Sequence, residues 1–369
     1  MKKPVIVCGA NGYTAKLICE YLRHFQVPFI AAGRSHQRVE DAMKLVPGIE
    51  TAEYEIAELP EDPADLKKLF AGAKVVCNTV GPFGVFSEPI VKAALEAGCH
   101  YVDTTGEQAY MLKMRDQFGE EFAREKLLLA PSVAHMSTVL ELACNAAAAH
   151  EEVDTIEAFS VVTGVPTYGS AQTFIQTVRA PEVYLVNRKL VPWAPCSSAE
   201  IRVPFTDRML LALPWGGSGL PLWYENDDRI RNMKVMSAFT DRQLMEGVVN
   251  IYRHYHAELA QLPEADQLEA LSKIAAGIQS GTPPRENPLI HRCWDTAIGS
   301  GTKGVVRYTM YSNCGYLQTG MLQAFAANWL VRQSPRAFGF RSAVQAFGAE
   351  SILGALERFG TARLVRDSA

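Results

Sequence analysis

The stretch VIVCGANGYTAKLICEYL, residues 5–22, decides the fold of the first part of the chain. Four apolar residues, Val5–Cys8, meet Gly9, and a second glycine, Gly12, follows three positions later. Apolar side chains then recur at the spacing of one helix face. The stretch therefore predicts a buried strand that passes through a glycine-containing turn into an amphipathic helix.

Short apolar runs and amphipathic segments alternate in the same way as far as about residue 131. We expect strands within 4–9, 27–33, 73–81, 100–106 and 127–132. We expect helices at about 12–24, 35–46, 62–71, 87–97 and 108–125. Short runs that are apolar on both faces are typical of a parallel sheet covered on both sides by helices. The predicted fold class is therefore α/β, with a Rossmann doubly wound parallel sheet over residues 1–131.

The pattern changes after Pro131. Alternating polarity predicts strands at 155–165 and 304–313. Helical spacing of apolar residues predicts helices at 241–280 and 317–334. We expect residues 132–334 to form a second, α+β domain that contains an antiparallel sheet. The C-terminal segment, about 335–369, is expected to return to the first domain.

Composition and charge exclude several classes of protein. The chain has 369 residues, of which 48% are hydrophobic, and a net charge of -4, with no dense cluster of Lys and Arg that a nucleic-acid partner would need. The 8 cysteines are scattered without metal-ligand spacing, so we expect reduced, buried thiols and no metal site. Neither a signal peptide nor an apolar stretch of membrane-spanning length is evident, so a cytoplasmic protein without membrane contact is expected.

The turn at the start of the chain, from Gly9 to Ala15, reads GxxGxxA and has the context of a dinucleotide-binding loop. The first glycine permits the tight turn, and the second lets backbone N–H groups approach a pyrophosphate at the positive end of the helix. The spacing differs from GxGxxG, so a glycine-containing turn without a ligand is the alternative. The residues expected to bind the pyrophosphate are Gly9, Asn11, Gly12, Tyr13 and Thr14.

The end of the second strand indicates which dinucleotide is bound. NAD-binding folds carry an acidic residue there for the ribose 2′-OH. This chain instead has Arg34 and Ser35, with Arg38 one helical turn further, and these groups suit a 2′-phosphate. In the alternative interpretation Arg34 is a solvated residue and Ser35 caps the next helix. We predict NADP(H) as the cofactor.

A loop at the end of the third predicted strand, 73–81, completes the expected cofactor site. Ligands of doubly wound sheets bind outside the carboxyl ends of the strands, so this loop should cover the ribose and the nicotinamide. A simple Gly-Pro turn is the alternative. The loop consists of Asn78, Thr79, Val80, Gly81, Pro82 and Phe83.

With these motifs in place, the chain resembles the saccharopine dehydrogenase-like reductase family. The matching segments are GANGYTAKL (9–17), AAGRS (31–35), VVCNTVGPF (75–83), SEPIVKAALEAG (87–98), HYVDTTGE (100–107) and AFGFRSAVQAFGAESILGALERFG (337–360). The resemblance implies a Rossmann domain, an α+β domain that often forms the dimer surface, bound NADP(H), and hydride transfer to a C=N, C=O or activated C=C bond. The divergent middle of the chain leaves the substrate undetermined, and its arginines show no arrangement that demands a dicarboxylate.

Three residues are candidates for delivering a proton to the reacting atom. Asp103 ends a predicted strand, and its alternative role is to cap the following turn. His135 follows the last strand of the first domain and titrates near neutral pH, but a hydrogen-bonded structural histidine is the alternative. Tyr168 lies in a glycine-flanked loop, where packing is the alternative. Trp193, Trp215 and Trp223, near Gly216 and Gly217, are candidates for an apolar substrate wall or for core.

These observations predict an NADP(H)-dependent oxidoreductase that reduces a small or medium organic substrate with an apolar portion, and that forms a homodimer. Two alternatives stay open. One is a trans-acting enoyl reductase of a lipid or polyketide pathway, which needs a long apolar groove in the second domain. The other is a non-catalytic NADP-binding sensor or scaffold.

Overall fold

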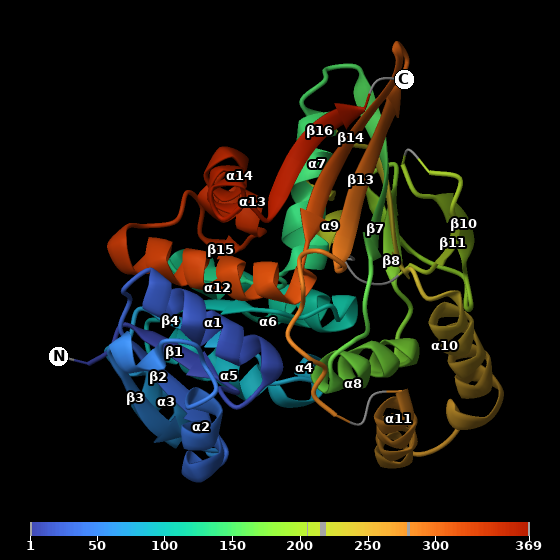
Figure 1. Ribbon diagram of the computed structural model, residues 1–369. Helices are drawn as coiled ribbons and strands as arrows, with labels where there is room; N and C mark the ends of the chain where they lie inside the picture. Colours follow the sequence, from blue (N-terminus) through green and yellow to red (C-terminus); the bar gives the residue numbers. More distant parts are fainter. Residues whose placement is uncertain (1, 205, 215–218, 279–280, 368–369) are drawn as a thin grey trace. The chain divides into compact units, whose positions relative to one another are not determined.

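The computed structural model describes residues 2–204, 206–214, 219–278 and 281–367 (Figure 1). The chain divides into two compact units, each made of segments that are far apart in the sequence. The first unit contains Met1–Thr105, Tyr110–His135 and Tyr316–Ala355. The second unit contains Gly106–Ala109, Met136–Gly315 and Leu356–Ala369.

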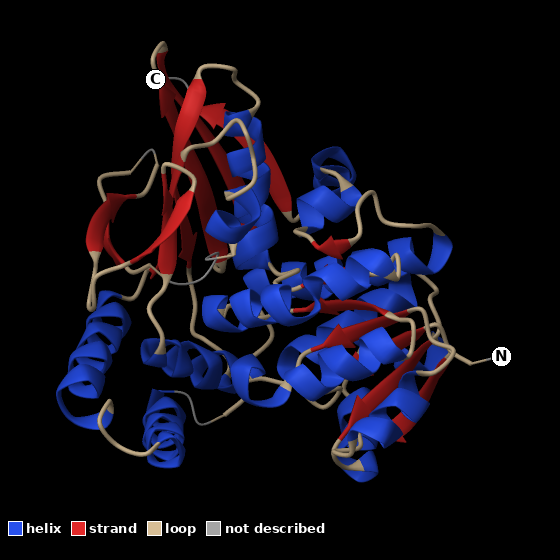
Figure 2. Ribbon diagram, turned by 180° about the vertical axis from the view of Figure 1, so that it is seen from behind, coloured by secondary structure: helices blue, strands red, loops and turns tan. Residues whose placement is uncertain are grey.

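The first unit is built on a seven-stranded sheet in the order β15-β6-β5-β4-β1-β2-β3, and all its strands are parallel. Its strands are β1 (Val5–Cys8), β2 (Phe29–Gly33), β3 (Tyr54–Glu58), β4 (Val75–Asn78), β5 (His100–Asp103), β6 (Leu128–Ala130) and β15 (Gly339–Phe340). The central strands β1 and β4 are buried along their whole length because helices cover both faces of the sheet (Figure 2). The Rossmann prediction is confirmed.

The helices of this unit occupy the expected places between the strands. They are α1 (Tyr13–His24), α2 (His36–Met43), α3 (Pro63–Phe70), α4 (Phe83–Phe86), α5 (Glu88–Glu96), α6 (Gln108–Arg124), α12 (Gly315–Arg332), α13 (Ala343–Phe347) and α14 (Ala349–Arg358), of which α6, α12 and α14 continue into the second unit by a few residues. Short 3-10 turns lie at Ile49–Thr51 and, in the second unit, at Thr177–Arg179.

Strand β3 was not predicted from the sequence. Its residues, YEIAE, carry glutamates at positions 55 and 58 and are half-buried or exposed. β3 is the edge strand of the sheet and pairs only with β2, so its side chains face more water than those of the central strands. A polar edge strand lacks the continuous apolar run by which the other strands were recognised.

The second unit is built on a mixed seven-stranded sheet in the order β16-β14-β13-β7-β12-β8-β9. Its strands are β7 (Val153–Val162), β8 (Val183–Val186), β9 (Lys189–Pro192), β12 (Asn232–Phe239), β13 (Arg292–Gly301), β14 (Gly304–Asn313) and β16 (Ala362–Asp367), with a separate hairpin of β10 (Ala199–Arg202) and β11 (Met209–Ala212). The pair β7–β12 is parallel and the remaining pairs are antiparallel, so the expected antiparallel sheet contains one parallel pair.

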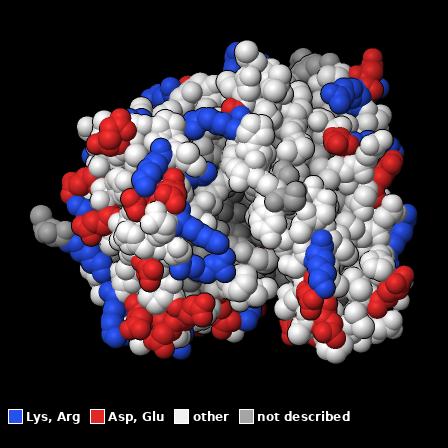
Figure 3. Space-filling model, turned by 60° about the horizontal axis from the view of Figure 1, so that its bottom comes forward, with Lys and Arg blue, Asp and Glu red and all other residues white. Residues whose placement is uncertain are grey.

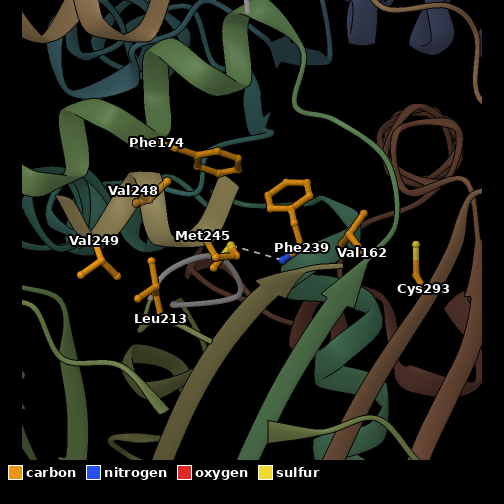
Figure 4. Packing of buried hydrophobic residues seen from close by; sticks show 8 residues of the cluster. All are labelled: Val162, Phe174, Leu213, Phe239, Met245, Val248, Val249 and Cys293. Carbon is orange, nitrogen blue, oxygen red and sulfur yellow. Dashed lines mark hydrogen bonds between the residues drawn. The ribbon is translucent and has the colours of Figure 1, made fainter. Parts of the chain in front are cut away.

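Helices cover one face and one end of this sheet. They are α7 (Leu140–Ala148), α8 (Tyr168–Gln176), α9 (Leu220–Tyr224), α10 (Arg242–His254) and α11 (Glu264–Ile278), with π-helical turns at His135–Val139 and Tyr255–Leu259. A buried apolar cluster joins α8 and α10 to the ends of β7 and β12 (Figure 4). In it the Phe239 N–H donates to Met245 Sδ at 3.4 Å, so the turn into α10 is held by a buried contact.

The boundaries of the two units differ from the expected domain boundaries at four places: Gly106–Ala109 belongs to the second unit, residues 132–135 belong to the first, and the other two concern α12 and the C-terminal strand. Most of α12, which we expected in the second domain, lies in the first unit. The cause is close packing on α1, since a Cβ at Gly320 would lie 2.6 Å from Leu17 Cβ. Strand β16, which we expected in the first domain, pairs antiparallel with β14 in the second sheet.

Several general features bear on function. In the described residues no helix is both long and apolar enough to cross a membrane. All eight cysteines are free, and seven of them are buried. Among the same residues no group of three His, Cys, Asp or Glu side chains is placed to hold a metal ion. On the face shown in Figure 3, basic and acidic side chains are interspersed.

Candidate functional site

The turn between β1 and α1 is closed by its own backbone. The N–H groups of Gly9 and Ala10 both donate to the Ala32 carbonyl oxygen of β2 at 2.9 Å, and the Gly12 N–H donates to the Gly9 carbonyl at 2.8 Å. Gly9 has φ +81, and a Cβ there would lie 2.7 Å from Thr79 Oγ1. A glycine is therefore required at position 9 for two reasons, its backbone conformation and the close approach of Thr79.

Helix α1 begins without a side-chain cap. Its N-cap is Gly12, and its first turn, which starts with Tyr13 and Thr14, contains no acidic residue. Five other helices, α2, α3, α8, α10 and α13, are instead capped by side chains that accept hydrogen bonds from the first turn, namely Ser35, Asp62, Thr167, Asp241 and Ser342. No side-chain cap therefore covers the positive end of the α1 dipole, as an anion-binding turn requires.

The end of β2 lies beside this turn. A Cβ at Gly33 would be 3.3 Å from Asn11 Oδ1, so the Asn11 side chain reaches the strand end that carries Arg34. Ser35 Oγ accepts from the Arg38 N–H at 3.4 Å, so the capping role that we considered for Ser35 is present. Arg34 and Arg38 are exposed, and neither guanidinium forms an ion pair within the described residues. Both are available for a phosphate.

Sequence reasoning missed a carboxylate at this place. Glu58 is the last residue of β3, and its Oε1 accepts from the His36 N–H in the first turn of α2 at 3.5 Å. The contact places a negative charge at the N-terminal end of α2, next to the element that carries Arg38. Glu58 was overlooked because the edge strand that positions it was not predicted.

Asn78 is buried, and its side-chain amide is fully used inside the protein. Its Nδ2 donates to Ser87 Oγ at 2.8 Å and to Tyr101 Oη at 2.9 Å, while its Oδ1 accepts from the Val80 N–H at 3.0 Å. The Ser87 hydroxyl donates in turn to the Val80 carbonyl at 3.0 Å. Asn78 therefore holds the shape of the loop rather than offering its amide to a ligand.

The rest of this loop faces the glycine turn and then becomes apolar. Thr79 donates to the Cys8 carbonyl at 2.8 Å, which ties the loop to the end of β1. After the cis Gly81–Pro82 peptide, Phe83 is buried against Tyr110, with ring centroids 5.9 Å apart. Val85 and Phe86 of α4 are 41% and 51% exposed, so α4 presents an apolar surface next to the loop.

Asp103 ends β5 and is completely buried. Its Oδ1 accepts from the N–H groups of Thr105 and Ser132 at 3.0 and 2.8 Å, and its Oδ2 accepts from the Tyr110 hydroxyl at 3.1 Å. Because the Tyr110 proton is directed to Asp103, the 2.9 Å contact between Tyr101 and Tyr110 has Tyr101 as the donor. Asn78, Tyr101, Tyr110 and Asp103 thus form one chain of hydrogen bonds between β4 and β5.

Burial raises the pKa of Asp103 to about 6, although the N–H groups of Ser132 and Thr105 act in the opposite direction. Burial also raises the pKa values of Tyr101 and Tyr110 well above their ordinary value. The tyrosines therefore stay protonated at neutral pH and serve as hydrogen-bond donors. Asp103 has the geometry of a residue that positions the loops around it.

His135 follows β6 and is 2% exposed. Its N–H donates to Thr319 Oγ1 at 3.0 Å, and Gln323 Nε2 donates to the carbonyls of Asp103 and Val133 at 2.6 and 2.9 Å. The loops after β5 and β6 are thus held by two buried side chains of α12. Sequence reasoning missed Thr319 and Gln323, since nothing in the local pattern connects them with residues about 200 positions earlier.

The remaining candidates belong to the second unit. Tyr168 is the first residue of α8 and is 47% exposed. Trp193 packs against Tyr184 with ring centroids 4.5 Å apart, and Trp223 is 5% exposed and belongs to the core. Trp215, Gly216 and Gly217 lie outside the described residues. The structure thus ties the segments that carry Asp103 and His135, at the carboxyl ends of β5 and β6, to the same helix α12, and it places Tyr168 in the other unit.

Comparisons with known proteins agree with this geometry. Residues 5–122 match the model of the saccharopine dehydrogenase NADP binding domain, and residues 138–367 match that of a family of unknown function (DUF5938). The glycine turn, Arg34 and the Asn78 loop all lie within the first match. Helix α1, which has no side-chain cap, and the unpaired arginines Arg34 and Arg38 fit a dinucleotide. The first unit is an NADP(H)-binding domain.

Individual relatives match only in part. The human saccharopine dehydrogenase-like oxidoreductase is 32% identical over 133 residues, which cover 32% of this chain and 31% of the relative. A trans-acting enoyl reductase of Mycobacterium bovis is 31% identical over 122 residues, which cover 32% of this chain and 29% of the relative. These matches span about a third of the length of either relative. Apo saccharopine dehydrogenase (L-Glu forming) of Saccharomyces cerevisiae has the same fold, with a TM-score of 0.63 over 100% of both chains at 12% identity.

Proposed function

We propose that this chain, which belongs to the family DUF5938 and is a divergent member of the saccharopine dehydrogenase-like oxidoreductases, transfers a hydride between NADP(H) and a small or medium organic substrate. When bound, the cofactor supplies or accepts the hydride. The reacting bond is a C=N, C=O or activated C=C bond, and the direction is reduction. The protein's own contribution is to bind and orient both partners and to deliver a proton.

The observation that carries this proposal is the uncapped N-terminus of α1 behind Gly9. A side-chain cap occupies one or two of the first N–H groups of a helix, and α1, which follows the glycine turn, carries no such cap. Arg34 and Arg38 supply positive charge where the 2′-phosphate of NADP(H) is expected. Glu58 would lie near that phosphate, so the attraction of the phosphate to the two arginines must exceed its repulsion from the Glu58 carboxylate.

The proton is delivered by His135 or by Tyr168 in this proposal, and Asp103 acts as a positioning residue. His135 sits on the loop after β6, whose start is held by Asp103 through Ser132. Tyr168 is exposed at the start of α8 and carries a hydroxyl that can donate. Asp103 has every carboxylate oxygen engaged by protein donors, which is why a role in orienting the loops is favoured over direct proton transfer.

The substrate is proposed to have an apolar portion. Val85 and Phe86 expose apolar surface on α4, directly after the loop that contacts the glycine turn. Exposed aromatic and branched side chains beside a polar binding loop are typical of sites that bind an apolar group next to a reacting bond.

The cofactor assignment is tested by Arg34→Ala. The variant should bind NADPH about ten- to a hundredfold more weakly, because charge-assisted hydrogen bonds to the 2′-phosphate are lost, while NADH binding changes little. Dissociation constants for both dinucleotides are measured by fluorescence titration. Arg124→Ala, at an exposed arginine of α6, is the matched control and should leave both constants unchanged. Equal weakening of NADPH and NADH by Arg34→Ala would contradict the 2′-phosphate contact.

The oxidoreductase activity is tested with a panel of imines, carbonyl compounds and enoyl thioesters, by following NADPH absorbance. Turnover of one class identifies the bond. Tight NADPH binding without consumption across the panel would favour a sensor or scaffold instead. A trans-acting enoyl reductase is the second candidate, because residues of this chain match such an enzyme at 31% identity. Selective turnover of long-chain enoyl thioesters would support it.

A homodimer and a cytoplasmic location complete the proposal. The second unit, with its mixed sheet, is the expected site of self-association. Light scattering coupled to gel filtration tests the oligomeric state, and fractionation of the source cells tests the location. A monomer at micromolar concentration would contradict the proposed dimer.

A further inference from the structure

An open hollow lies on the second unit, where the ends of β13, β14 and β16 meet. It has a volume of about 520 Å³. The hollow, which we call the arginine hollow, has a lining that includes Arg292, Trp294, Tyr311, Asn313, Thr361 and Arg363. A hollow of this volume is within the range of pockets that bind small organic molecules.

The strand register explains why these side chains gather on one face. Trp294 of β13 stands directly opposite Tyr311 of β14, and Tyr311 stands opposite Arg363 of β16. Arg292 stands opposite Asn313 in the same ladder, two residues from the Trp294–Tyr311 pair. Residues two apart on a strand share a face, and paired residues share it as well. Both arginines therefore flank a floor of two aromatic side chains.

The arginines lie on strands that are separated by one intervening strand, β14. Neighbouring strands are about 4.8 Å apart, and the register offsets the two arginines by two residues along the strands, so their backbone positions are about 12 Å apart. Long guanidinium side chains that start at this separation can converge on one ligand between them. The two guanidinium groups can thus bind one ligand that lies on the aromatic rings of Trp294 and Tyr311, which we call the aromatic floor.

The electrostatic environment of the arginine hollow favours an anion. Its lining residues include two arginines and no Asp or Glu. Neither Arg292 nor Arg363 forms an ion pair within the part of the chain that the structure describes. On the same face of β16, Asp367 is 6% exposed, and its Oδ2 already accepts from Thr309 at 2.7 Å. The Asp367 charge acts on Tyr311, so one carboxylate lies beside two guanidinium groups and the hollow keeps a net positive charge.

The aromatic floor favours a flat ligand. Trp294 is half-buried against the apolar cluster that joins the β10–β11 hairpin to the sheet, which holds its ring in place. Burial raises the pKa of Tyr311 to about 12, so its phenol remains protonated at neutral pH. Aromatic rings stack on planar groups, and guanidinium groups bind carboxylates and phosphates through two parallel hydrogen bonds.

We infer that the arginine hollow binds a small organic anion, a carboxylate or phosphate attached to a flat apolar group, with Arg292 and Arg363 on the anion and Trp294 and Tyr311 beneath the flat group. This site lies wholly within the second unit, and its existence does not depend on the proposed hydride transfer.

The experiment uses the full-length protein and measures ligand binding by saturation-transfer NMR titration. Benzoate and phenyl phosphate are the probes, benzyl alcohol is their uncharged counterpart, and inorganic phosphate lacks the flat group. We expect saturable binding of benzoate or phenyl phosphate at millimolar concentration or below, and weaker binding of both comparison compounds. Added salt should weaken the binding of the anions.

Variants locate the binding. Arg292→Gln and Arg363→Gln should each weaken binding of the anionic probe about tenfold, and Trp294→Leu should weaken the aromatic probes while leaving inorganic phosphate unchanged. Arg366→Gln is the matched control, because Arg366 is an exposed arginine of the same strand that stands opposite Tyr308, on the other face. It should bind as the unmodified protein does. NADPH affinity and the thermal unfolding transition, measured in parallel, report whether the first unit and the chain as a whole are folded in each variant.

Two outcomes would overturn the inference. One is equal binding of the aromatic anions by the double variant Arg292→Gln/Arg363→Gln and by Arg366→Gln, in protein that still binds NADPH. The other is the absence of saturable binding of either anionic probe to the unmodified protein. Inorganic phosphate that binds as tightly as phenyl phosphate would contradict the role of the aromatic floor. None of these results depends on turnover, so they stand apart from the test of the proposed function.

Discussion

The glycine turn of the first unit and the arginine hollow of the second unit present positive charge by different means. In the turn, the charge comes from backbone N–H groups at the start of α1, and glycines keep side chains away from it. In the hollow, the charge comes from two arginine side chains on strands that are not neighbours. The turn is made of seven consecutive residues, whereas the hollow needs strands that are about 70 residues apart in the sequence.

This difference teaches how each site depends on its surroundings. A backbone site tolerates changes in distant side chains but not the addition of a Cβ, because the ligand must come close to the chain. A side-chain site has the opposite sensitivity. It depends on the register of β13, β14 and β16, since a shift by one residue would send each arginine to the other face of the sheet.

The largest effect is expected for Gly9→Ala. The new Cβ would lie 2.7 Å from Thr79 Oγ1, and φ +81 is unfavourable for alanine, so the turn must open. NADPH affinity should fall by about a hundredfold or more, because a small displacement of the turn misaligns the N–H groups at α1. Titration calorimetry with NADPH measures this loss.

Gly98→Ala is the matched control for this change. Gly98 also has a positive φ, +72, but no atom lies within 4 Å of its Cβ position. The control should lose about 1 kcal/mol of unfolding free energy from backbone strain and keep its NADPH affinity. If both variants bind NADPH equally well, close approach at Gly9 does not matter for the cofactor.

The next effect concerns the buried chain of hydrogen bonds that ends at Asp103. Its pKa is about 6 in the folded protein, above its value of 3.8 in an unperturbed carboxyl group, so folding favours the protonated form. This contribution to stability is full below pH 4 and is lost as the pH rises through 6. The total change is on the order of 3 kcal/mol, from about two pKa units.

Asp103→Asn should therefore lack this loss of stability between pH 4 and 6. Urea unfolding at several pH values measures the free energy of unfolding of both proteins. The variant Asp116→Asn, at an exposed residue of α6, should follow the curve of the unmodified protein. A constant difference between the unmodified protein and Asp103→Asn over this pH range would refute the raised pKa.

The smallest effect is expected at a helix of the second unit whose N-terminus is closed. Thr167 Oγ1 accepts from the Ser170 N–H at 3.1 Å and caps α8. Thr167→Ala should lower the free energy of unfolding by about 1 kcal/mol, and Thr167→Ser should restore it. NADPH affinity should not change, since the cap that stabilises α8 is distinct from the pyrophosphate contact proposed at α1. A loss of NADPH binding in Thr167→Ala would remove that distinction.

Sequence reasoning succeeded where a feature depends on neighbours in the chain. The strand, turn and helix around Gly9 form within about twenty residues, and the apolar runs of the central parallel strands mark them as buried. It failed at β3, whose edge position exposes its side chains, and at β16, whose partner strand lies about 50 residues earlier. It named Asn78 and Asp103 as site residues but did not foresee that Tyr101 and Tyr110 connect them.

The amino-acid sequence alone determined the fold class, the glycine turn and the preference for NADP(H), because strand-turn-helix geometry and the residue at the end of β2 are local properties. Only the tertiary structure decided which polar groups stay free. Thr319 and Gln323 hold the loops of Asp103 and His135, while Arg292 and Arg363 are left without a carboxylate partner in the described chain. Whether a polar side chain is satisfied or available depends on what long-range packing places beside it, and no local pattern of residues contains that information.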